Sequence, residues 1–225
     1  MEADVLIIGG GAAGTVAALL LAKAGKHCII LEKNGQIGRK LRITGKGRCN
    51  LTNACDLDTL MANVPRNPKF LYSAFARWMP EDVMAYFEQL GVPLKVERGN
   101  RAEDIVAALQ RALKRAGIPV YRETVQQLLL QEGRCTGVQT ASGKQYAANC
   151  VLLAAGGASY PATGSTGDGY TLAKQAGHTI VPPLPALVPL EVQEKWCSDL
   201  MGLSLRNVSL KLYNGKKCCY DALGE

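Results

Sequence analysis

Residues 4–14 read Asp4-Val5-Leu6-Ile7-Ile8-Gly9-Gly10-Gly11-Ala12-Ala13-Gly14, and this stretch decides the fold. The apolar run predicts a buried strand, the glycines predict a tight turn, and the small residues that follow predict a helix packed closely on a sheet. Residues 28–33, Cys28-Ile29-Ile30-Leu31-Glu32-Lys33, predict a second buried strand that ends in a carboxylate. Strand, turn, helix, strand and acid come in the order and spacing of a dinucleotide-binding fingerprint.

Each polar or glycine position of this fingerprint has a physical role. Gly9 allows the tight turn, and Gly11 lets the backbone approach a pyrophosphate at the helix N-terminus, where N–H groups are unpaired. Gly14 lets the helix pack closely on the sheet. Glu32, eighteen residues after Gly14, is placed to accept hydrogen bonds from a ribose diol. The sequence therefore predicts an α/β domain that binds a dinucleotide.

A membrane-spanning segment or a secretory signal is the alternative interpretation of the same stretch. Residues 5–22 carry no charge, which reaches the length of a transmembrane candidate. However, the preceding residues 1–4 are acidic where a signal peptide needs positive charge, and three consecutive glycines weaken a helix in lipid. We therefore expect no membrane association.

Composition and cysteine usage indicate an ordinary soluble globular protein. The 225 residues are 48% hydrophobic and 20% charged, with a net charge of +7. The basic residues are scattered rather than striped, so we expect no nucleic-acid partner. None of the eight cysteines has the spacing of a metal site, and with no signal peptide we expect free thiols in the cytoplasm and no bound metal.

The rest of the chain alternates between helical and strand patterns. Residues 102–116 form the clearest amphipathic helix, with Ile105, Leu109 and Leu113 on one face. A glycine-rich basic loop is expected at 34–53, followed by three helices that end at Gly91, of which the second begins at Pro68 and the third at Pro80. A strand is expected at 94–97, and a strand and β-meander at 120–122, 125–131, 135–140 and 145–147. A buried parallel strand at 150–155 and a helix at 170–176 complete this part of the chain.

A change in pattern near residues 182–189 predicts a domain boundary. Prolines concentrate there, and the following residues favour strands at 188–192, 208–213 and 216–220, with Asn214-Gly215 as a hairpin turn. We expect a Rossmann-like dinucleotide-binding domain with a parallel sheet and β-meander over residues 1–185. Residues 186–225 would begin an inserted β-rich substrate domain.

A longer motif narrows the family. Residues 38–53 read Gly38-Arg39-Lys40-Leu41-Arg42-Ile43-Thr44-Gly45-Lys46-Gly47-Arg48-Cys49-Asn50-Leu51-Thr52-Asn53. This run resembles the YhiN/BaiN-type, aminoacetone oxidase-like family of FAD-dependent oxidoreductases, within the two-dinucleotide-binding-domain flavoproteins. The turn at 155–157 and the Thr166-Gly167-Asp168-Gly169-Tyr170 segment form a second match, which fumarate-reductase-like flavoproteins share.

The resemblance implies an extended FAD whose adenosine end lies against residues 9–14 and Glu32, with residues 38–53 along the pyrophosphate and isoalloxazine. Charged and polar side chains of that loop suit this role, since cations pair with phosphate. Asp168 could instead, or in addition, cap a helix. The cofactor-binding residues expected in all are Gly9, Gly11, Ala13, Gly14, Glu32, Lys33, Arg39, Lys40, Thr44, Gly45, Asn50, Val125, Ala155, Gly156, Gly157 and Asp168.

The implied function is a cytosolic FAD-dependent oxidoreductase that transfers hydride between a nicotinamide cofactor, oxygen or both and a small organic substrate. No catalytic acid or base is assigned, and no oligomeric state. An RNA-modifying flavoprotein and a non-enzymatic flavin-binding scaffold are the alternatives. For Cys49, a packing or flavin-lining role is favoured over a redox-active thiol.

Two departures from the family pattern stand out. A segment expected between the strand near Leu94 and the helix near Ile105 is missing, and the chain ends at Glu225, short of the family's length. We expect residues to be omitted between Asn100 and Arg101, which would separate their Cα atoms by clearly more than the roughly 3.8 Å of a trans peptide. A true deletion is the alternative.

Overall fold

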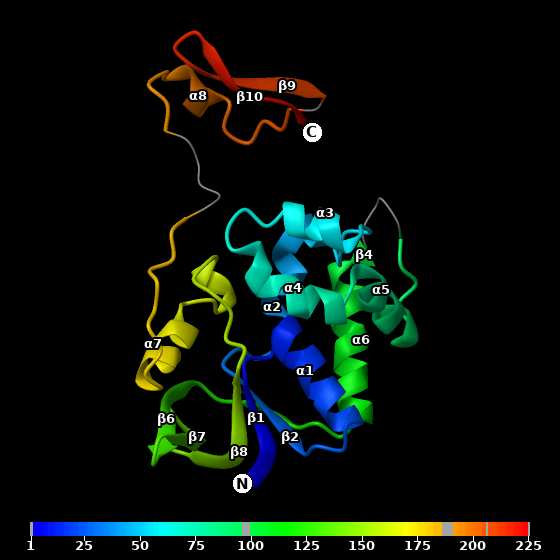
Figure 1. Cartoon of the computed structure of the whole chain (residues 1–225), viewed down its shortest axis with the longest axis vertical. Helices are drawn as coiled ribbons and strands as arrows, with labels where there is room; N and C mark the ends of the chain where they lie inside the picture. The colour runs from blue at the N-terminus through cyan, green and yellow to red at the C-terminus, as the bar shows by residue number, and fades with distance from the viewer. Residues whose placement is uncertain (1, 96–99, 186–190, 206, 225) are drawn as a thin grey trace. The chain divides into compact units, whose positions relative to one another are not determined.

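The computed structural model describes residues 2–95, 100–185, 191–205 and 207–224, without the side chains of Thr44 and Lys46. It divides the chain into two compact units, residues 1–182 and 183–225 (Figure 1). Each unit is described by itself.

A six-stranded sheet forms the centre of the first unit. Its strand order is β5-β2-β1-β8-β7-β6. The bounds are β1 Glu2–Ile8, β2 Cys28–Glu32, β5 Val120–Arg122, β6 Val125–Gln131, β7 Arg134–Thr140 and β8 Gln145–Leu153. Strands β5, β2, β1 and β8 are mutually parallel, while β7 and β6 continue the sheet as an antiparallel meander. This confirms the predicted Rossmann-like sheet, including the parallel pairing of β1 with β2.

Helices of the first unit follow the sequence patterns with small shifts. Their bounds are α1 Ala12–Lys23, α2 Arg39–Ile43, α3 Leu57–Ala62, α4 Pro68–Arg77, α5 Pro80–Gln89, α6 Ala102–Arg115 and α7 Asp168–Gln175, with 3₁₀ turns η1 Thr44–Gly47 and η2 Pro161–Thr163. The amphipathic pattern at 102–116 is confirmed as α6, which buries Ile105, Leu109 and Leu113. Among these described helices, none has the length and apolar character needed to cross a bilayer.

The core lies on both faces of the sheet because β1 and β2 carry continuous apolar runs, at residues 5–8 and 28–31. Ile7 and Ile30 point to the face covered by α1 and α6, which lie side by side in Figure 1. Leu6 and Ile29 point to the other face and pack with side chains of β6, β7 and α7. A continuous apolar run, rather than an alternating one, is what a parallel strand buried on both sides requires.

Several sequence predictions were wrong in detail. The expected loop at 34–53 contains α2, η1 and the short strand β3 Arg48–Cys49. The strands expected at 145–147 and 150–155 are one strand, β8. Leu94 and Lys95 lie in no strand, and residues 96–97 of that prediction fall outside the described residues.

The expected omission between Asn100 and Arg101 is also wrong. The two residues are consecutive in strand β4 Asn100–Arg101, which pairs antiparallel with β3. Asn100 is opposite Cys49, and Arg101 is opposite Arg48. The buried Asn100 side chain also donates to the carbonyl of Pro93, at 2.7 Å.

The second unit is a small β-rich segment. It contains helix α8 Trp196–Asp199 and the antiparallel hairpin of β9 Val208–Asn214 and β10 Lys217–Gly224. The two-residue turn is Gly215-Lys216, one position beyond the predicted Asn214-Gly215. Of the strand expected at 188–192, residues 188–190 lie outside the described residues, and Glu191 and Val192 are not in a strand.

Candidate functional site

The carboxyl ends of the central parallel strands meet at one edge of the sheet. Ile8 of β1 is in register with Leu31 of β2 and Leu153 of β8. Hydrogen bonds continue just past these ends, from the Gly9 N–H to the Leu31 carbonyl and from the Ala154 N–H to the Ile8 carbonyl. This edge is where ligands bind in open parallel sheets.

The glycine turn that leaves β1 is required by close packing. Gly9 has a φ of +108°, and a Cβ there would collide with the Ala154 carbonyl. A Cβ on Gly14 would collide with the Gly9 carbonyl. A Cβ on Gly11, by contrast, would meet no atom of the described chain within 4 Å. The protein itself leaves the space beside Gly11 open, which is the space that a closely approaching ligand needs.

The N-terminus of α1 faces this open space. Gly11 is the N-cap residue and contributes no side-chain cap, and Ala12 and Ala13 are exposed. The first turn of a helix carries N–H groups without intrahelical partners and a partial positive charge. This end of α1 therefore favours an anion such as a phosphate.

Glu32 lies buried at the end of β2, with 8% of its surface exposed. Its Oε2 accepts from the backbone N–H of Gly10 at 2.7 Å. Its Oε1 accepts from the backbone N–H and from the side-chain amide of Asn34, both at 2.7 Å. The carboxylate is thus held in one orientation beside the glycine turn.

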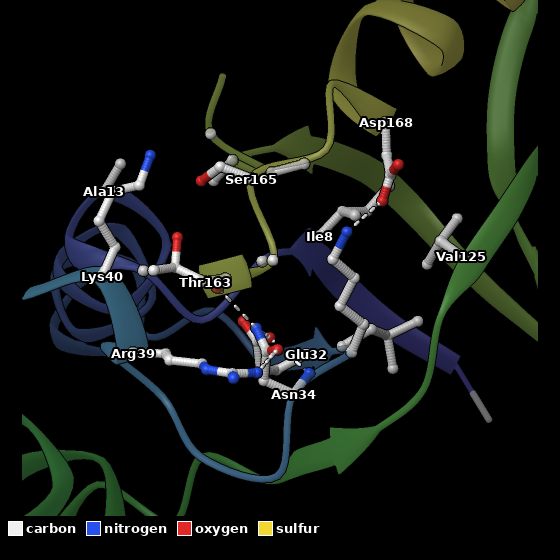
Figure 2. A pocket seen from close by; sticks show the side chains of 18 of the residues that line it. Ile8, Ala13, Glu32, Asn34, Arg39, Lys40, Val125, Thr163, Ser165 and Asp168 are labelled. Carbon is white, nitrogen blue, oxygen red and sulfur yellow. Dashed lines mark hydrogen bonds and ion pairs between the residues drawn. The ribbon is translucent and has the colours of Figure 1, made fainter. Parts of the chain in front are cut away.

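A groove of about 350 Å³ runs along this edge (Figure 2). Eleven of the sixteen predicted residues line it: Gly9, Gly11, Ala13, Glu32, Lys33, Arg39, Lys40, Val125, Ala155, Gly156 and Asp168. Sequence reasoning gave no site role to Asn34, Thr163 and Ser165, which also line it. For Ser165, the neighbouring Thr166-Gly167-Asp168 motif was a usable signal, while nothing local distinguishes the other two.

The remaining five predicted residues lie elsewhere. Gly14 packs under the turn, and the carbonyl of Gly157 accepts from the N–H of Gly167. Thr44 and Gly45 form η1. Asn50 lines two neighbouring hollows, of about 360 and 210 Å³. The smaller one shares Ala12 and Leu41 with the groove, and it also reaches the buried Cys49.

Cationic side chains on the groove wall are tied to specific partners. Lys33 Nζ lies 2.6 Å from both Asp168 Oδ2 and Thr166 Oγ1, and Thr166 Oγ1 donates to Asp168 Oδ1 at 2.7 Å. Burial on its own raises the pKa of Asp168, but the bonds from Lys33 and Thr166 outweigh it and lower that pKa below its usual value. The predicted helix-capping role is not seen, because Asp168 is the first residue of α7 and Gly167 is its N-cap.

The buried thiols and acidic groups give no sign of a metal site. In the part of the chain that the structure describes, no group of three or more His, Cys, Asp or Glu side chains could hold a metal ion. All eight cysteines are free. Burial raises the pKa of the Cys49 thiol, which disfavours the reactive thiolate.

The sequence and the architecture have counterparts in known proteins. Residues 3–219 match the model of the HI0933-like protein Rossmann domain. The chain belongs to the HI0933-like family. This confirms the family resemblance and the Rossmann-like α/β fold that the sequence predicts.

Two curated relatives and one solved structure illustrate the likeness. The chain is 34% identical over 197 residues to 3-dehydro-bile acid delta(4,6)-reductase of Clostridium scindens, covering 84% of this chain and 47% of the relative. It is 33% identical over 212 residues to ribosomal RNA dihydrouridine synthase of Haemophilus influenzae, covering 89% and 52%. A flavocytochrome c3 fumarate reductase shares the fold, with a TM-score of 0.65 and 22% identity over 78% of this chain and 40% of that chain. The chain thus spans about half the length of the curated relatives it matches.

Proposed function

We propose that this HI0933-like chain supplies the FAD-binding part of an oxidoreductase that passes hydride from a nicotinamide cofactor through the flavin to a small organic substrate or oxygen. Residues 1–185 would form the FAD-binding domain, and residues 186–225 would begin an inserted β-rich substrate domain. The observation that carries the proposal is the groove in which the open N-terminus of α1 and the buried Glu32 carboxylate lie side by side.

The groove residues fit the chemical groups of FAD. The carboxylate of Glu32 would accept hydrogen bonds from the adenosine ribose, and Val125 would lie at the adenine. The first-turn N–H groups of α1 would face the pyrophosphate, with Arg39 and Lys40 balancing its charge. When bound, FAD supplies the atom that accepts and delivers hydride.

The other predicted residues divide between the groove wall and the flavin end. Lys33, Ala155, Gly156 and Asp168 would border the cofactor along the groove, while Gly14 and Gly157 shape the turns behind it. We propose that Thr44, Gly45 and Asn50 serve the isoalloxazine end, because the hollow lined by Asn50 continues from the groove at Ala12 and Leu41. No residue is assigned as catalytic acid or base.

The names of the relatives suggest a substrate class. One is a delta(4,6)-reductase, and the other is named for making dihydrouridine. Both names describe the addition of hydrogen across a carbon–carbon double bond of a ring. We therefore favour reduction of an activated carbon–carbon double bond as the reaction of this chain's oxidoreductase.

An RNA-modifying flavoprotein is the second candidate. It is favoured by the relative named for ribosomal RNA and by the net charge of +7. RNA binding of this kind weakens steeply with salt, because it releases counterions from phosphates. Retention on ribosomal RNA that falls steeply between low and physiological salt would favour this candidate over a free small molecule.

A cytoplasmic location is also part of the proposal. It is supported by the eight free cysteines, which suit a reducing compartment.

The direct test is an anaerobic titration of the purified protein. The bound flavin is released and identified by chromatography, and bleaching of its visible absorption is followed on addition of NADH, of NADPH, and of dithionite as a control. An α,β-unsaturated ketone, oxygen and a uridine-containing RNA are then compared as oxidants of the reduced protein.

Bleaching by a nicotinamide cofactor and rapid reoxidation by the unsaturated ketone would support the proposal. Bound FAD that dithionite reduces and neither nicotinamide cofactor reduces would favour a flavin-binding scaffold. Protein that neither carries nor takes up FAD would overturn the proposed function.

A further inference from the structure

The Asn34 side chain connects two nearby residues of the groove wall, Glu32 and Arg39, to Thr163, which lies 129 residues away in the sequence. Its side-chain amide donates to Glu32 Oε1 at 2.7 Å and to the carbonyl of Thr163 at 3.3 Å. Its Oδ1 accepts from Arg39 Nη1 at 3.0 Å. Figure 2 shows Asn34 between the Glu32 carboxylate and the Arg39 guanidinium, with Thr163 on the opposite loop.

The backbone around Asn34 is shaped to admit this side chain. Gly164, on the loop that follows η2, has a φ of +95°. A Cβ on Gly164 would lie 2.5 Å from the Asn34 amide nitrogen, so a larger residue there would displace Asn34. The Asn34 side chain therefore packs directly against the backbone of the Gly164 loop.

We propose that Asn34 is a positioning residue for the adenosine diphosphate half of FAD. It orients the Glu32 carboxylate toward the ribose and the Arg39 guanidinium toward the pyrophosphate, and it holds the Thr163 loop against both. This inference rests on the proposed function, because it assumes that FAD is the ligand of the groove.

The hydrogen-bond capacity of each group supports this role. A carboxylate offers about four acceptor positions. Gly10 and Asn34 use three of them, which fixes the rotation of the Glu32 carboxylate and leaves room for a ribose hydroxyl. A guanidinium has five N–H donors, and the bond to Asn34 fixes the direction in which Arg39 presents the others.

Only an amide suits this position. It donates to a carboxylate and to a carbonyl while it accepts from a guanidinium. An aspartate would keep the acceptor for Arg39 and would lose both donors. It would also place a second negative charge beside the Glu32 carboxylate, and the two like charges would repel each other.

The test compares wild-type protein with Asn34→Ala, with the isosteric Asn34→Asp, and with Asn149→Ala as a matched control. Asn149 makes one side-chain bond, to Asp4 at 3.4 Å on the exposed part of the sheet, and does not line the groove. Affinities are measured calorimetrically for FAD, ADP and 2′,3′-dideoxy-ADP, which lacks the ribose hydroxyls. Circular dichroism checks that each variant is folded.

We expect the Asn34→Ala variant to bind FAD and ADP about tenfold more weakly than wild type, as for loss of a hydrogen bond to a charged group. Asn34→Asp should bind both more weakly still, and Asn149→Ala should match wild type. Wild type should prefer ADP over the dideoxy analogue, and both Asn34 variants should lose most of that preference. A purely structural defect would weaken the binding of ADP and of its dideoxy analogue equally.

An unchanged preference for ADP in the folded Asn34→Asp variant would overturn the positioning role, as would wild-type FAD affinity in either Asn34 variant. Wild-type protein that binds neither FAD nor ADP would instead mean that the proposed function has failed.

Discussion

The backbone N–H of Gly10 donates to Glu32 Oε2 at 2.7 Å, across 22 residues of sequence, in the buried part of the groove wall. This bond joins the turn after β1 to the end of β2. It also explains why Gly10 is glycine, since a Cβ there would lie 2.9 Å from Ile37 Cγ2 and 3.2 Å from Glu32 Oε2. The middle glycine of the turn is needed for the carboxylate to approach.

Gly14→Ala should destabilise the fold. Alanine gains up to about 1 kcal/mol over glycine in a helix. Here its Cβ would meet the Gly9 carbonyl, so α1 must shift from the sheet, at a cost of about 1–3 kcal/mol, as for overpacked cores. The free energy of unfolding in urea measures the difference. Gly35→Ala is the control, because a Cβ on Gly35 meets nothing within 4 Å, and equal stability of the two variants would contradict this packing.

Asp168→Asn should make the free energy of unfolding less dependent on pH in the acidic range. Although burial alone raises the pKa of Asp168, bonds from Lys33 and Thr166 lower it in the folded protein. A lowered carboxyl pKa adds stability that is present above the unfolded-state pKa of about 4 and is lost as the pH falls through the folded value.

Wild type should therefore be more stable than Asp168→Asn at pH 7, and the difference should shrink below about pH 4. Urea unfolding of both proteins from neutral to acidic pH measures it. A difference that stays constant over this range would show that the Lys33–Asp168 pair does not contribute in this way.

Cys49 should react slowly with alkylating agents. Its thiol is buried, burial raises its pKa, and the thiolate is the reactive form. Brief iodoacetamide treatment of the native protein should label the exposed Cys150, Cys218 and Cys219, and should reach Cys49 only after denaturation. Mass spectrometry locates the label. If Cys49 were labelled as fast as Cys150, the result would instead favour a redox-active Cys49 thiol.

The fold was predictable wherever a local pattern was strong. Strands β1 and β2 follow from apolar runs bounded by glycine and acid, and α6 follows from its apolar periodicity. Helix α2 was missed because Arg39–Ile43 is short and basic, with no apolar face to reveal it. β8 was predicted as two strands because the polar Asn149 interrupts the apolar pattern inside a continuous strand.

The site was predictable where the motif itself carries the chemistry. Gly11 and Glu32 lie within one strand–helix–strand unit, so their spacing fixes their relation. Asn34 and Thr163 meet across 129 residues of sequence, and only the tertiary fold brings them together. No local pattern marks such a contact, and the role of Asn34 could not be predicted for that reason.

The central claim, that the groove holds FAD with Glu32 on the ribose, is tested most directly by titrating FAD into wild type and Glu32→Gln while following flavin fluorescence. Glu103→Gln serves as the control, because Glu103 pairs with Arg42 and does not line the groove. We expect one FAD per chain for wild type and for the control. Glu32→Gln should bind FAD at least about tenfold more weakly than wild type, since the variant loses hydrogen bonds to a charged acceptor. Wild-type protein that binds no FAD, or Glu32→Gln that binds it as tightly as wild type, would contradict the claim.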